Sequence, residues 1–211
     1  IPGSHLSGWP RLRIMAERFI ARRFRRRVER YMVQTPTMAA ALATWYGPDA
    51  PPIDVAPFIA RAHSGPGTAP SARQGSPRWD FIYVSDGPVH KNHKRLFEAW
   101  RLLAAEGVFP SLAVTLHPER DGALRGDLRI LIDQTGARIE DLGQMPHGEV
   151  LKAYRQSGAL IFPSYAESFG LPLVEAGAAG LPILAPELDY VRDICDPAVT
   201  FDAFSPRSIA R

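Results

Sequence analysis

Short apolar runs alternate with helix-like stretches in the sequence beyond residue 79. The runs lie at residues 81–84, 112–116, 137–142, 159–163, 183–185 and 199–201. Parallel strands need a crossover between them, which is usually a helix, whereas antiparallel strands need only a short turn. The alternation therefore predicts an α/β domain in which a parallel sheet carries helices on both faces.

One helical stretch is well defined by its apolar spacing. Leu96, Trp100 and Leu103 recur at intervals of three and four residues, so they line one face of a helix. Gly107 follows, and glycine adopts most easily the left-handed conformation that ends a helix. We expect a helix over residues 92–106 whose apolar face packs on the sheet.

The residues before the sheet form a separate region. Residues 31–46 predict a short strand, a helix cap at Thr35 and a helix. Residues 64–77 contain three Gly, three Pro and three Ser among fourteen residues, which is typical of a flexible linker or surface loop. The predicted organisation is therefore an N-terminal region at 1–57, a linker at 58–78 and an α/β domain at 79–211.

Positive charge is concentrated near the N-terminus. The chain carries a net charge of +3, but residues 11–30 hold nine Arg against two Glu, a local charge of +7 that leaves −4 for the remainder. Apolar residues recur there at roughly helical spacing, so Arg11–Arg30 predicts a basic amphipathic helix. Two interpretations stay open: a solvated helix of a neighbouring domain, or peripheral contact with anionic lipid or a lipid diphosphate acceptor.

The segment Ser164–Glu175, SYAESFGLPLVE, contains the most informative polar residues. Pro172 suits the first position of a helix, where its missing N–H costs nothing. This places Glu175 one turn inside the helix and leaves Glu167 in the preceding loop, so that both carboxylates flank one ligand. Between them, we expect the backbone N–H groups at the positive end of the helix dipole to form an anion site. These N–H groups belong to Ser168, Phe169, Gly170 and Leu171.

The spacing of the two glutamates resembles the Glu-x7-Glu signature of retaining glycosyltransferases of the GT-B fold, particularly family 4 (glycosyl transferases group 1). The segments FIYVSDGPVHKNHKRLFEAW, ALIFPS and GLPILAPELDYVRDI resemble parts of the C-terminal, donor-binding domain of that family, in the expected order. The resemblance covers residues 53–208. It implies a Rossmann-like parallel sheet, and it identifies residues 1–57 as a remnant of the N-terminal, acceptor-side domain.

The resemblance also assigns roles to the residues that match the family's motifs. Lys91 matches the lysine that contacts the donor diphosphate, where its charge stabilises the leaving phosphate. Glu167 is expected to accept hydrogen bonds from hydroxyls of the donor sugar, and Glu175 from the two ribose hydroxyls. Further donor-binding residues are expected at the ends of the neighbouring strands: Ser85, His90, Asn92 and Met145.

The chain departs from the family pattern directly after the first strand. Many members carry Gly-Arg there, whereas this chain has Ser85-Asp86-Gly87. A second cation is thus missing from the expected diphosphate site, and His90 is its expected substitute because a phosphate neighbour favours the charged imidazole. His90 and His93 also form a His-x-x-His pair, but no third metal ligand has suitable spacing, and the family requires no divalent metal. We expect no metal and no cofactor beyond the nucleotide-sugar donor.

Length and composition narrow the functional classes. At 211 residues the chain is too short for both domains of such an enzyme, so we expect a fragment that is inactive without the rest of the N-terminal domain. The single cysteine, Cys195, excludes an internal disulfide framework, and no apolar run reaches the roughly 18 residues of a membrane span. We expect a cytoplasmic protein, with peripheral contact to the inner face of the membrane as an option, and no nucleic-acid partner.

The main hypothesis is a retaining glycosyltransferase that moves a sugar from a nucleotide-diphosphate sugar to a glycan or lipid-linked acceptor in bacterial polysaccharide biosynthesis. One alternative is a nucleotide-sugar 2-epimerase of the same fold, which shares the nucleotide site but needs acid and base side chains around the sugar. The other is a non-catalytic module that binds nucleotide or anionic lipid.

Overall fold

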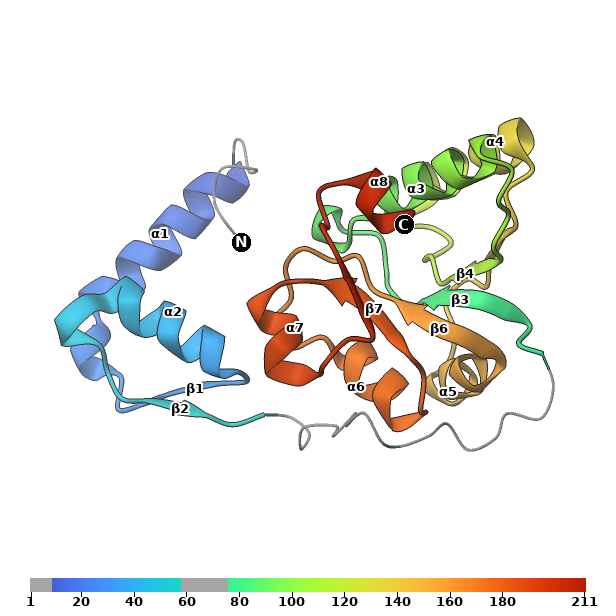
Figure 1. The fold of residues 1–211 in the computed structure, drawn as a ribbon. Coiled ribbons are helices and arrows are strands. Elements are labelled where there is room, and N and C mark those ends of the chain that lie inside the picture. The colour runs from blue at the N-terminus through green and yellow to red at the C-terminus, as the bar shows by residue number, and fades with distance from the viewer. Residues whose placement is uncertain (1–8, 58–75) are drawn as a thin grey trace. The chain divides into compact units, whose positions relative to one another are not determined.

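Two compact units make up the structure, a computed structural model that describes residues 9–57 and 76–211. The units divide at residue 60, with Ile1–Ala60 in the first and Arg61–Arg211 in the second. Residues 58–75, which make up most of the linker predicted at 58–78, lie outside the described residues. Figure 1 shows the elements of both units.

The first unit contains a parallel βαβ arrangement preceded by a helix. Its elements in chain order are helix α1 (Trp9–Arg23), the 3₁₀ turn η2 (Arg25–Arg27), strand β1 (Tyr31–Val33), helix α2 (Pro36–Tyr46), the 3₁₀ turn η3 (Gly47–Asp49) and strand β2 (Ile53–Val55). β1 and β2 pair in parallel. Thr35 caps α2, because its side-chain oxygen accepts a hydrogen bond from the N–H of Met38 at 3.2 Å. The strand, cap and helix predicted for residues 31–46 are confirmed.

The basic helix is shorter than predicted. α1 ends at Arg23, and a 3₁₀ turn replaces the next part of the expected helix. In a continuing helix Arg22 and Arg23 would lie four residues before Arg26 and Arg27, and like charges at this spacing repel each other. The observed turn instead lets Arg25 pair with Asp49. Arg30 pairs with Asp54 in the same way, so part of the positive charge stabilises this unit.

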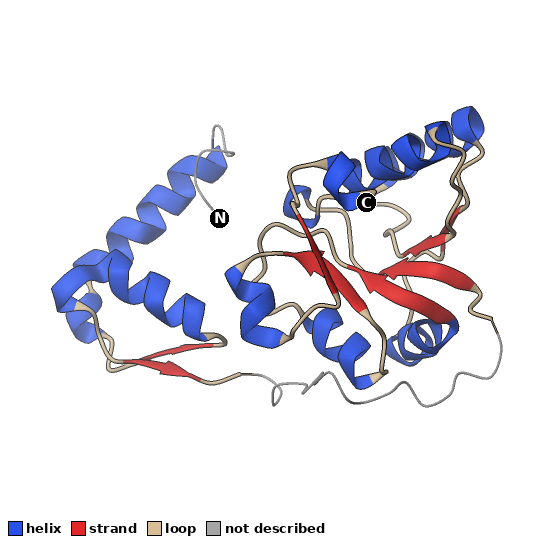
Figure 2. Ribbon diagram, viewed as in Figure 1, coloured by secondary structure: helices blue, strands red, loops and turns tan. Residues whose placement is uncertain are grey.

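The second unit is built on a six-stranded parallel sheet. Its strands are β3 (Trp79–Tyr83), β4 (Leu112–Val114), β5 (Ile139–Asp141), β6 (Ser157–Ile161), β7 (Ile183–Pro186) and β8 (Val199–Phe201). Their order across the sheet is β5-β4-β3-β6-β7-β8, and every neighbouring pair is parallel (Figure 2). All six predicted strands are present.

Several strands end earlier than the apolar runs indicated. β4 stops at Val114 and β6 at Ile161, two residues before each predicted end. The apolar side chains beyond these ends, Leu116 and Phe162, are nevertheless fully buried. Burial thus continues beyond the residues that form the strands, and a hydrophobic pattern cannot distinguish the two.

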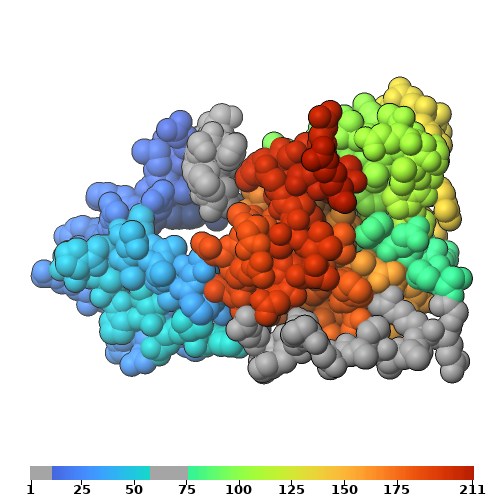
Figure 3. Space-filling model, in the orientation of Figure 1, coloured from blue at the N-terminus to red at the C-terminus, as the bar shows by residue number. Residues whose placement is uncertain are grey.

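Helices cover both faces of the sheet, so the predicted α/β fold class is confirmed. One layer holds α3 (His93–Ala105), α4 (Gly122–Thr135) and α8 (Pro206–Ile209), and the other holds α5 (His147–Gln156), α6 (Leu171–Ala178) and α7 (Asp189–Ile194). As predicted, α3 buries Leu96 and Trp100, and Gly107 follows it with a φ of +77°. Figure 3 shows one face of the molecule, on which the C-terminal segments, coloured orange to red, form a continuous surface.

The direction of the crossovers reverses between β3 and β6. From β3 the chain moves outward to β4 and β5, whereas from β6 it moves to β7 and β8 on the opposite side. Doubly wound sheets bind ligands beyond the carboxyl ends of the strands at this switch point. The segments that leave β3 and β6 meet there, since the N–H of Tyr165 donates to the carbonyl oxygen of His90 at 3.0 Å.

His93, at the start of α3, is an unsatisfied polar residue in the core. Among the described residues, the buried side-chain nitrogens without a hydrogen-bond partner both belong to it. Its ring is 2% exposed and lies 4.8 Å from the ring of Tyr83 and 6.1 Å from that of Phe97, measured between centroids. Burial lowers the pKa of His93 to about 4, although the Asp121 carboxylate acts in the opposite direction.

Acidification should destabilise the protein through His93. The unfolded chain takes up this proton near pH 6.5, whereas the folded protein resists it down to about pH 4. The free energy of unfolding is therefore unaffected by this group above pH 6.5. It falls as the pH drops from 6.5 to 4, by on the order of 3 kcal/mol, which urea denaturation measures. His93→Leu should flatten this dependence and add about 1 kcal/mol at neutral pH, since it removes two unsatisfied nitrogens. An unchanged pH profile in the variant would rule out His93 as the titrating group.

Candidate functional site at the carboxyl edge of the sheet

Strand β3 leads into a segment that presents a lysine at the switch point. The 3₁₀ turn η4 (Val89–Lys91) connects this segment to α3. The hydroxyl of Tyr83 donates a hydrogen bond to the carbonyl oxygen of Lys91 at 2.7 Å, and it lies 3.0 Å from the hydroxyl oxygen of Ser164. Burial raises the pKa of Tyr83, so its hydroxyl stays protonated. The backbone of Lys91 is thus tied to the loops that follow both central strands.

Asn92 fixes the backbone between Lys91 and α3. It is the one non-glycine residue with a positive φ, +66°, in the described part of the chain, and Asn tolerates this conformation better than most residues. Its side-chain nitrogen donates to the carbonyl oxygens of Pro163 at 3.0 Å and Ala203 at 2.7 Å, and its side-chain oxygen accepts from Arg95. These bonds use both hydrogens of the side-chain amide and one lone pair of its oxygen. The contact of Asn92 with a donor stays a prediction.

A mostly buried ion pair joins the two loops. Lys91 Nζ lies 2.8 Å from Oε1 and 2.9 Å from Oε2 of Glu167, and the two side chains are 17% and 8% exposed. Glu167 lies in the loop between β6 and α6, as predicted. Because a buried charge is costly without a partner, each of these groups offsets the cost of burying the other. The structure thus brings two predicted site residues, 76 positions apart, into contact.

The loop after β6 turns into α6 at Gly170, which has a φ of +78°. The helix begins at Leu171, so Pro172 occupies its second position and not the predicted first. The N–H groups of Gly170 and Leu171 donate to no backbone acceptor within the described residues, which suits the predicted anion site. Ser168 is exposed beside them, whereas the side chain of Phe169 is buried in the core.

Glu175 lies one turn inside α6, as predicted, and two residues of α5 hold its carboxylate. The hydroxyl of Tyr154 donates to Oε2 at 3.2 Å, and Nδ1 of His147 lies 3.5 Å from Oε1. Burial, reinforced by the Glu175 carboxylate, raises the pKa of Tyr154, so this hydroxyl remains a donor. The sequence analysis missed both partners. Tyr154 lies on an apolar helix face that indicates only core, and no motif marks His147.

A cavity of about 190 Å³ opens at the carboxyl ends of β3, β4 and β5. Ser85 and Met145, both predicted site residues, line this cavity, and Met145 and Val150 form an apolar wall. Its polar lining is formed by Ser85, Asp86, Thr115, His117, Arg120 and Gln144. An apolar wall beside several polar groups is the usual lining of a site for a small planar ligand.

Asp121 ties together the loops that follow β3 and β4. Its Oδ2 accepts hydrogen bonds from the N–H groups of Gly87 at 3.0 Å and His117 at 2.8 Å. A Cβ atom on Gly87 would meet Oδ1 of Asp121 at 2.4 Å, so this contact requires glycine. Nδ1 of His117 in turn accepts from the N–H groups of Glu119 and Arg120. This network sets the shape of the cavity on the side of β4.

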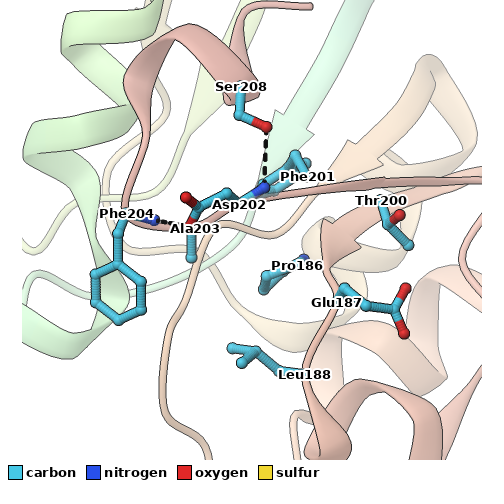
Figure 4. A pocket seen from close by; sticks show the side chains of 9 residues that line it. All are labelled: Pro186, Glu187, Leu188, Thr200, Phe201, Asp202, Ala203, Phe204 and Ser208. Atoms are coloured by element: carbon cyan, nitrogen blue, oxygen red, sulfur yellow. Dashed lines mark hydrogen bonds between the residues drawn. The ribbon is translucent and has the colours of Figure 1, made fainter.

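A larger cavity, about 420 Å³, lies beyond the ends of β7 and β8 (Figure 4). Two acids, Glu187 and Asp202, line it, and no Lys, Arg or His does. Glu187 is paired with Arg192, which holds the pKa of this carboxyl below its usual range. Asp202 accepts a hydrogen bond from the N–H of Phe204, drawn as a dashed line in Figure 4. Without a cation, this cavity does not suit an anionic ligand despite its size.

The His90 and His93 pair does not form a metal site, because His93 is buried in the core while His90 lies in the partly exposed turn η4. Within the described residues, no group of three or more His, Cys, Asp or Glu side chains is arranged to hold a metal ion. Nor is any helix in residues 9–57 and 76–211 both long and apolar enough to cross a membrane. Cys195, the single cysteine of the sequence, is buried.

Comparison with known proteins agrees with this architecture. The sheet order and the loops at its switch point are those of a doubly wound α/β domain. Residues 70–210 match the family described as Glycosyl transferases group 1, and the chain belongs to that family.

Relatives and solved structures extend the comparison. The D-inositol 3-phosphate glycosyltransferase of Arthrobacter sp. (strain FB24) is 32% identical over 167 residues, which are 74% of this chain and 39% of the relative. The chain thus spans about two fifths of the length of the curated relatives that it matches. Sucrose-phosphate synthase from Thermosynechococcus elongatus is similar with a TM-score of 0.70 and 17% identity, over 97% of this chain and 53% of that one. HepE from Anabaena in complex with UDP and glucose is similar with a TM-score of 0.67 and 18% identity, over 97% and 56%.

Gly87→Ala should break the tie between the two loops. The added methyl group would overlap the Asp121 carboxylate, so we expect the free energy of unfolding in urea to fall by about 1 to 3 kcal/mol. Gly126→Ala is the matched control, because nothing lies within 4 Å of a Cβ atom at that position in α4. It should raise stability by about 0.5 to 1 kcal/mol through helix propensity. The same effect in both variants would contradict the steric explanation.

Proposed function

We propose that the protein is the donor-binding part of a retaining glycosyltransferase. It would move a sugar from a nucleotide-diphosphate sugar to a glycan or lipid-linked acceptor, in bacterial polysaccharide biosynthesis. The observation that carries the proposal is the contact between Lys91 and Glu167 at the switch point of the sheet. Family membership supports glycosyl transfer, and the similar HepE structure holds UDP and glucose.

The proposed donor lies across the two loops at the switch point. Its diphosphate is placed near Lys91 and the N–H groups of Gly170 and Leu171, where a cation and a helix N-terminus favour negative charge. Glu167 accepts hydrogen bonds from sugar hydroxyls, and Glu175 from the vicinal hydroxyls of the ribose. Tyr154 orients the Glu175 carboxylate for this contact. No metal or further cofactor is invoked.

The proposed reaction keeps the anomeric configuration. The bond between the anomeric carbon and the diphosphate oxygen breaks, while a bond to the acceptor hydroxyl forms on the same face of the sugar. The leaving phosphate oxygen takes the acceptor proton, so no protein base is required. Lys91 stabilises the negative charge that accumulates on this oxygen, and the protein otherwise contributes positioning.

A nucleotide-sugar 2-epimerase remains the alternative within the same fold. It would bind the nucleotide in the same place but would need an acid and a base beside the sugar. The ion pair at the switch point supplies one carboxylate and one ammonium group, which are already engaged with each other. Product analysis separates the two activities, because only the transferase forms a new glycosidic bond.

Peripheral contact with an anionic membrane through residues 11–30 is a further part of the proposal. In α1 the side chains of Leu12, Met15, Phe19 and Ile20 are 54% to 70% exposed beside the arginines. Such a face suits the boundary between lipid headgroups and acyl chains. The charge is not all free for this purpose, since the Arg22 guanidinium lies 4.7 Å from the ring centroid of Trp45.

Thermal stabilisation by nucleoside diphosphates tests donor binding directly. One of UDP, GDP and dTDP should raise the unfolding temperature of this chain in a concentration-dependent way. Glu175→Ala should weaken binding of that diphosphate about 10- to 100-fold in calorimetry, because the ribose hydroxyls lose a charged acceptor. Glu149→Ala, which removes an exposed glutamate of α5 that pairs with Lys152, is the control and should bind normally. If no diphosphate stabilises the chain, the proposed function is wrong.

Lys91→Ala in the intact enzyme should lower kcat at least about 100-fold, with a smaller change in KM, because the lysine acts on charge that develops in the transition state. Steady-state transfer assays measure both constants. Lys94→Ala is the control, since Lys94 is 78% exposed and pairs with Asp127 on the helix surface. A rise in KM alone for Lys91→Ala would contradict stabilisation of the leaving group.

A further inference from the structure

Uncompensated positive charge is scarce where the donor diphosphate is proposed to bind. The ammonium group of Lys91 already lies 2.8 Å from the Glu167 carboxylate, so its charge is balanced before a ligand arrives. Asp86, which lines the neighbouring cavity, adds a negative charge. A diphosphate is strongly anionic and is bound in proteins by charge-assisted hydrogen bonds. This edge of the sheet therefore needs another cation if it is to hold such a ligand.

Arg120 lines the same cavity and is exposed. Its guanidinium group forms no ion pair with any residue that the structure describes. Other cations near this edge are already engaged. Lys94 pairs with Asp127 at 3.6 Å. Arg125 pairs with Asp141 at 2.6 Å. Arg120 is thus a cation at the cavity with its charge available.

The backbone around Arg120 is held in place from both sides. Its own N–H donates to Nδ1 of His117 at 3.1 Å. Asp121, the next residue, is 9% exposed and binds the N–H of Gly87 at 3.0 Å, in the loop after β3. A long side chain that starts from a fixed backbone loses less freedom when it meets a ligand. These contacts hold the Arg120 backbone beside the segment Ser85–Gly87.

We infer that Arg120 binds the phosphate groups of the nucleotide donor, an inference that rests on the function proposed above. The guanidinium group presents its N–H donors in a planar fork that matches two oxygens of one phosphate. Arg120 thereby supplies, from the loop after β4, the second cation that the segment Ser85-Asp86-Gly87 lacks. It is a binding residue for the donor and takes no part in bond breaking.

The competing explanation for the position of Arg120 is that it binds the base of the nucleotide. The cavity already offers groups suited to a base, because Met145 and Val150 form an apolar wall and Gln144 has both donors and acceptors. Arg120 has only donors and a full charge, which favours an anion. The two explanations predict different affinities when Arg120 is replaced. If Arg120 binds phosphate, the loss of affinity grows with the number of phosphates in the ligand, whereas if it binds the base, the loss is the same for every ligand.

Calorimetry on the 211-residue chain distinguishes the two explanations. The probes are UDP, UMP and uridine, or the matching guanosine or thymidine series. Arg120→Ala should weaken binding of the diphosphate about 10- to 100-fold and change binding of the nucleoside less than about 3-fold. Arg120→Lys should recover part of the loss, since it keeps the charge without the fork. Arg129→Ala, an exposed arginine of α4 outside the cavity, should behave like the unsubstituted chain.

Two results would overturn the inference while leaving the proposed function intact. In the first, Arg120→Ala binds the diphosphate as tightly as the unsubstituted chain. In the second, it loses equal affinity for nucleoside and diphosphate, which assigns Arg120 to the base. If the unsubstituted chain binds no nucleoside diphosphate at all, the proposed function and this inference are both wrong.

Discussion

The side chain of Asn92 holds together the loops that form the candidate site. Its amide nitrogen bonds the carbonyl oxygens of Pro163 and Ala203, which follow β6 and β8, while its own backbone starts α3 after β3. Parallel strands share no hairpin turns, so the loops at their carboxyl ends are separate segments, and side-chain bonds of this kind connect them. Lys91 is the preceding residue. Its ammonium group meets Glu167 only while these three loops keep their relative positions.

The apolar pattern predicted the sheet well because apolar residues indicate burial. The strands of this sheet are runs of mostly buried residues, so each strand appears in the sequence as an apolar run. The run at 199–201 coincides with β8, whereas other runs extend past their strands into buried residues such as Leu116 and Phe162. The basic helix was predicted too long for a different reason. Arg25 and Arg30 bind acids of later segments, Asp49 and Asp54, and helical periodicity carries no information about such partners.

The candidate site was predictable where one segment contains it and unpredictable where several segments meet. Glu167 and Glu175 belong to one motif, and the structure places them in a loop and a helix as predicted. The contact of Lys91 with Glu167 depends on the strand order, which the sequence does not state. The hydroxyl of Tyr154 reaches Glu175 from another helix, and no spacing rule identifies that pair. The bonds of Asn92 to Pro163 and Ala203 likewise join segments far apart in the sequence, so its motif does not indicate them.

The hydrogen bond between Gly87 and Asp121 makes the length of the loop after β3 depend on the length of the loop after β4. A residue inserted between His117 and Asp121 would withdraw the carboxylate from Gly87 and distort the crossover after β3 as well. The turn at Gly143, after β5, is tied to the crossover after β4 in turn, since Oδ1 of Asp141 accepts hydrogen bonds from the N–H groups of both Gly143 and Leu116. The turns after β3, β4 and β5 thus form a series of linked segments, in which a change of length in the middle one displaces both of its neighbours.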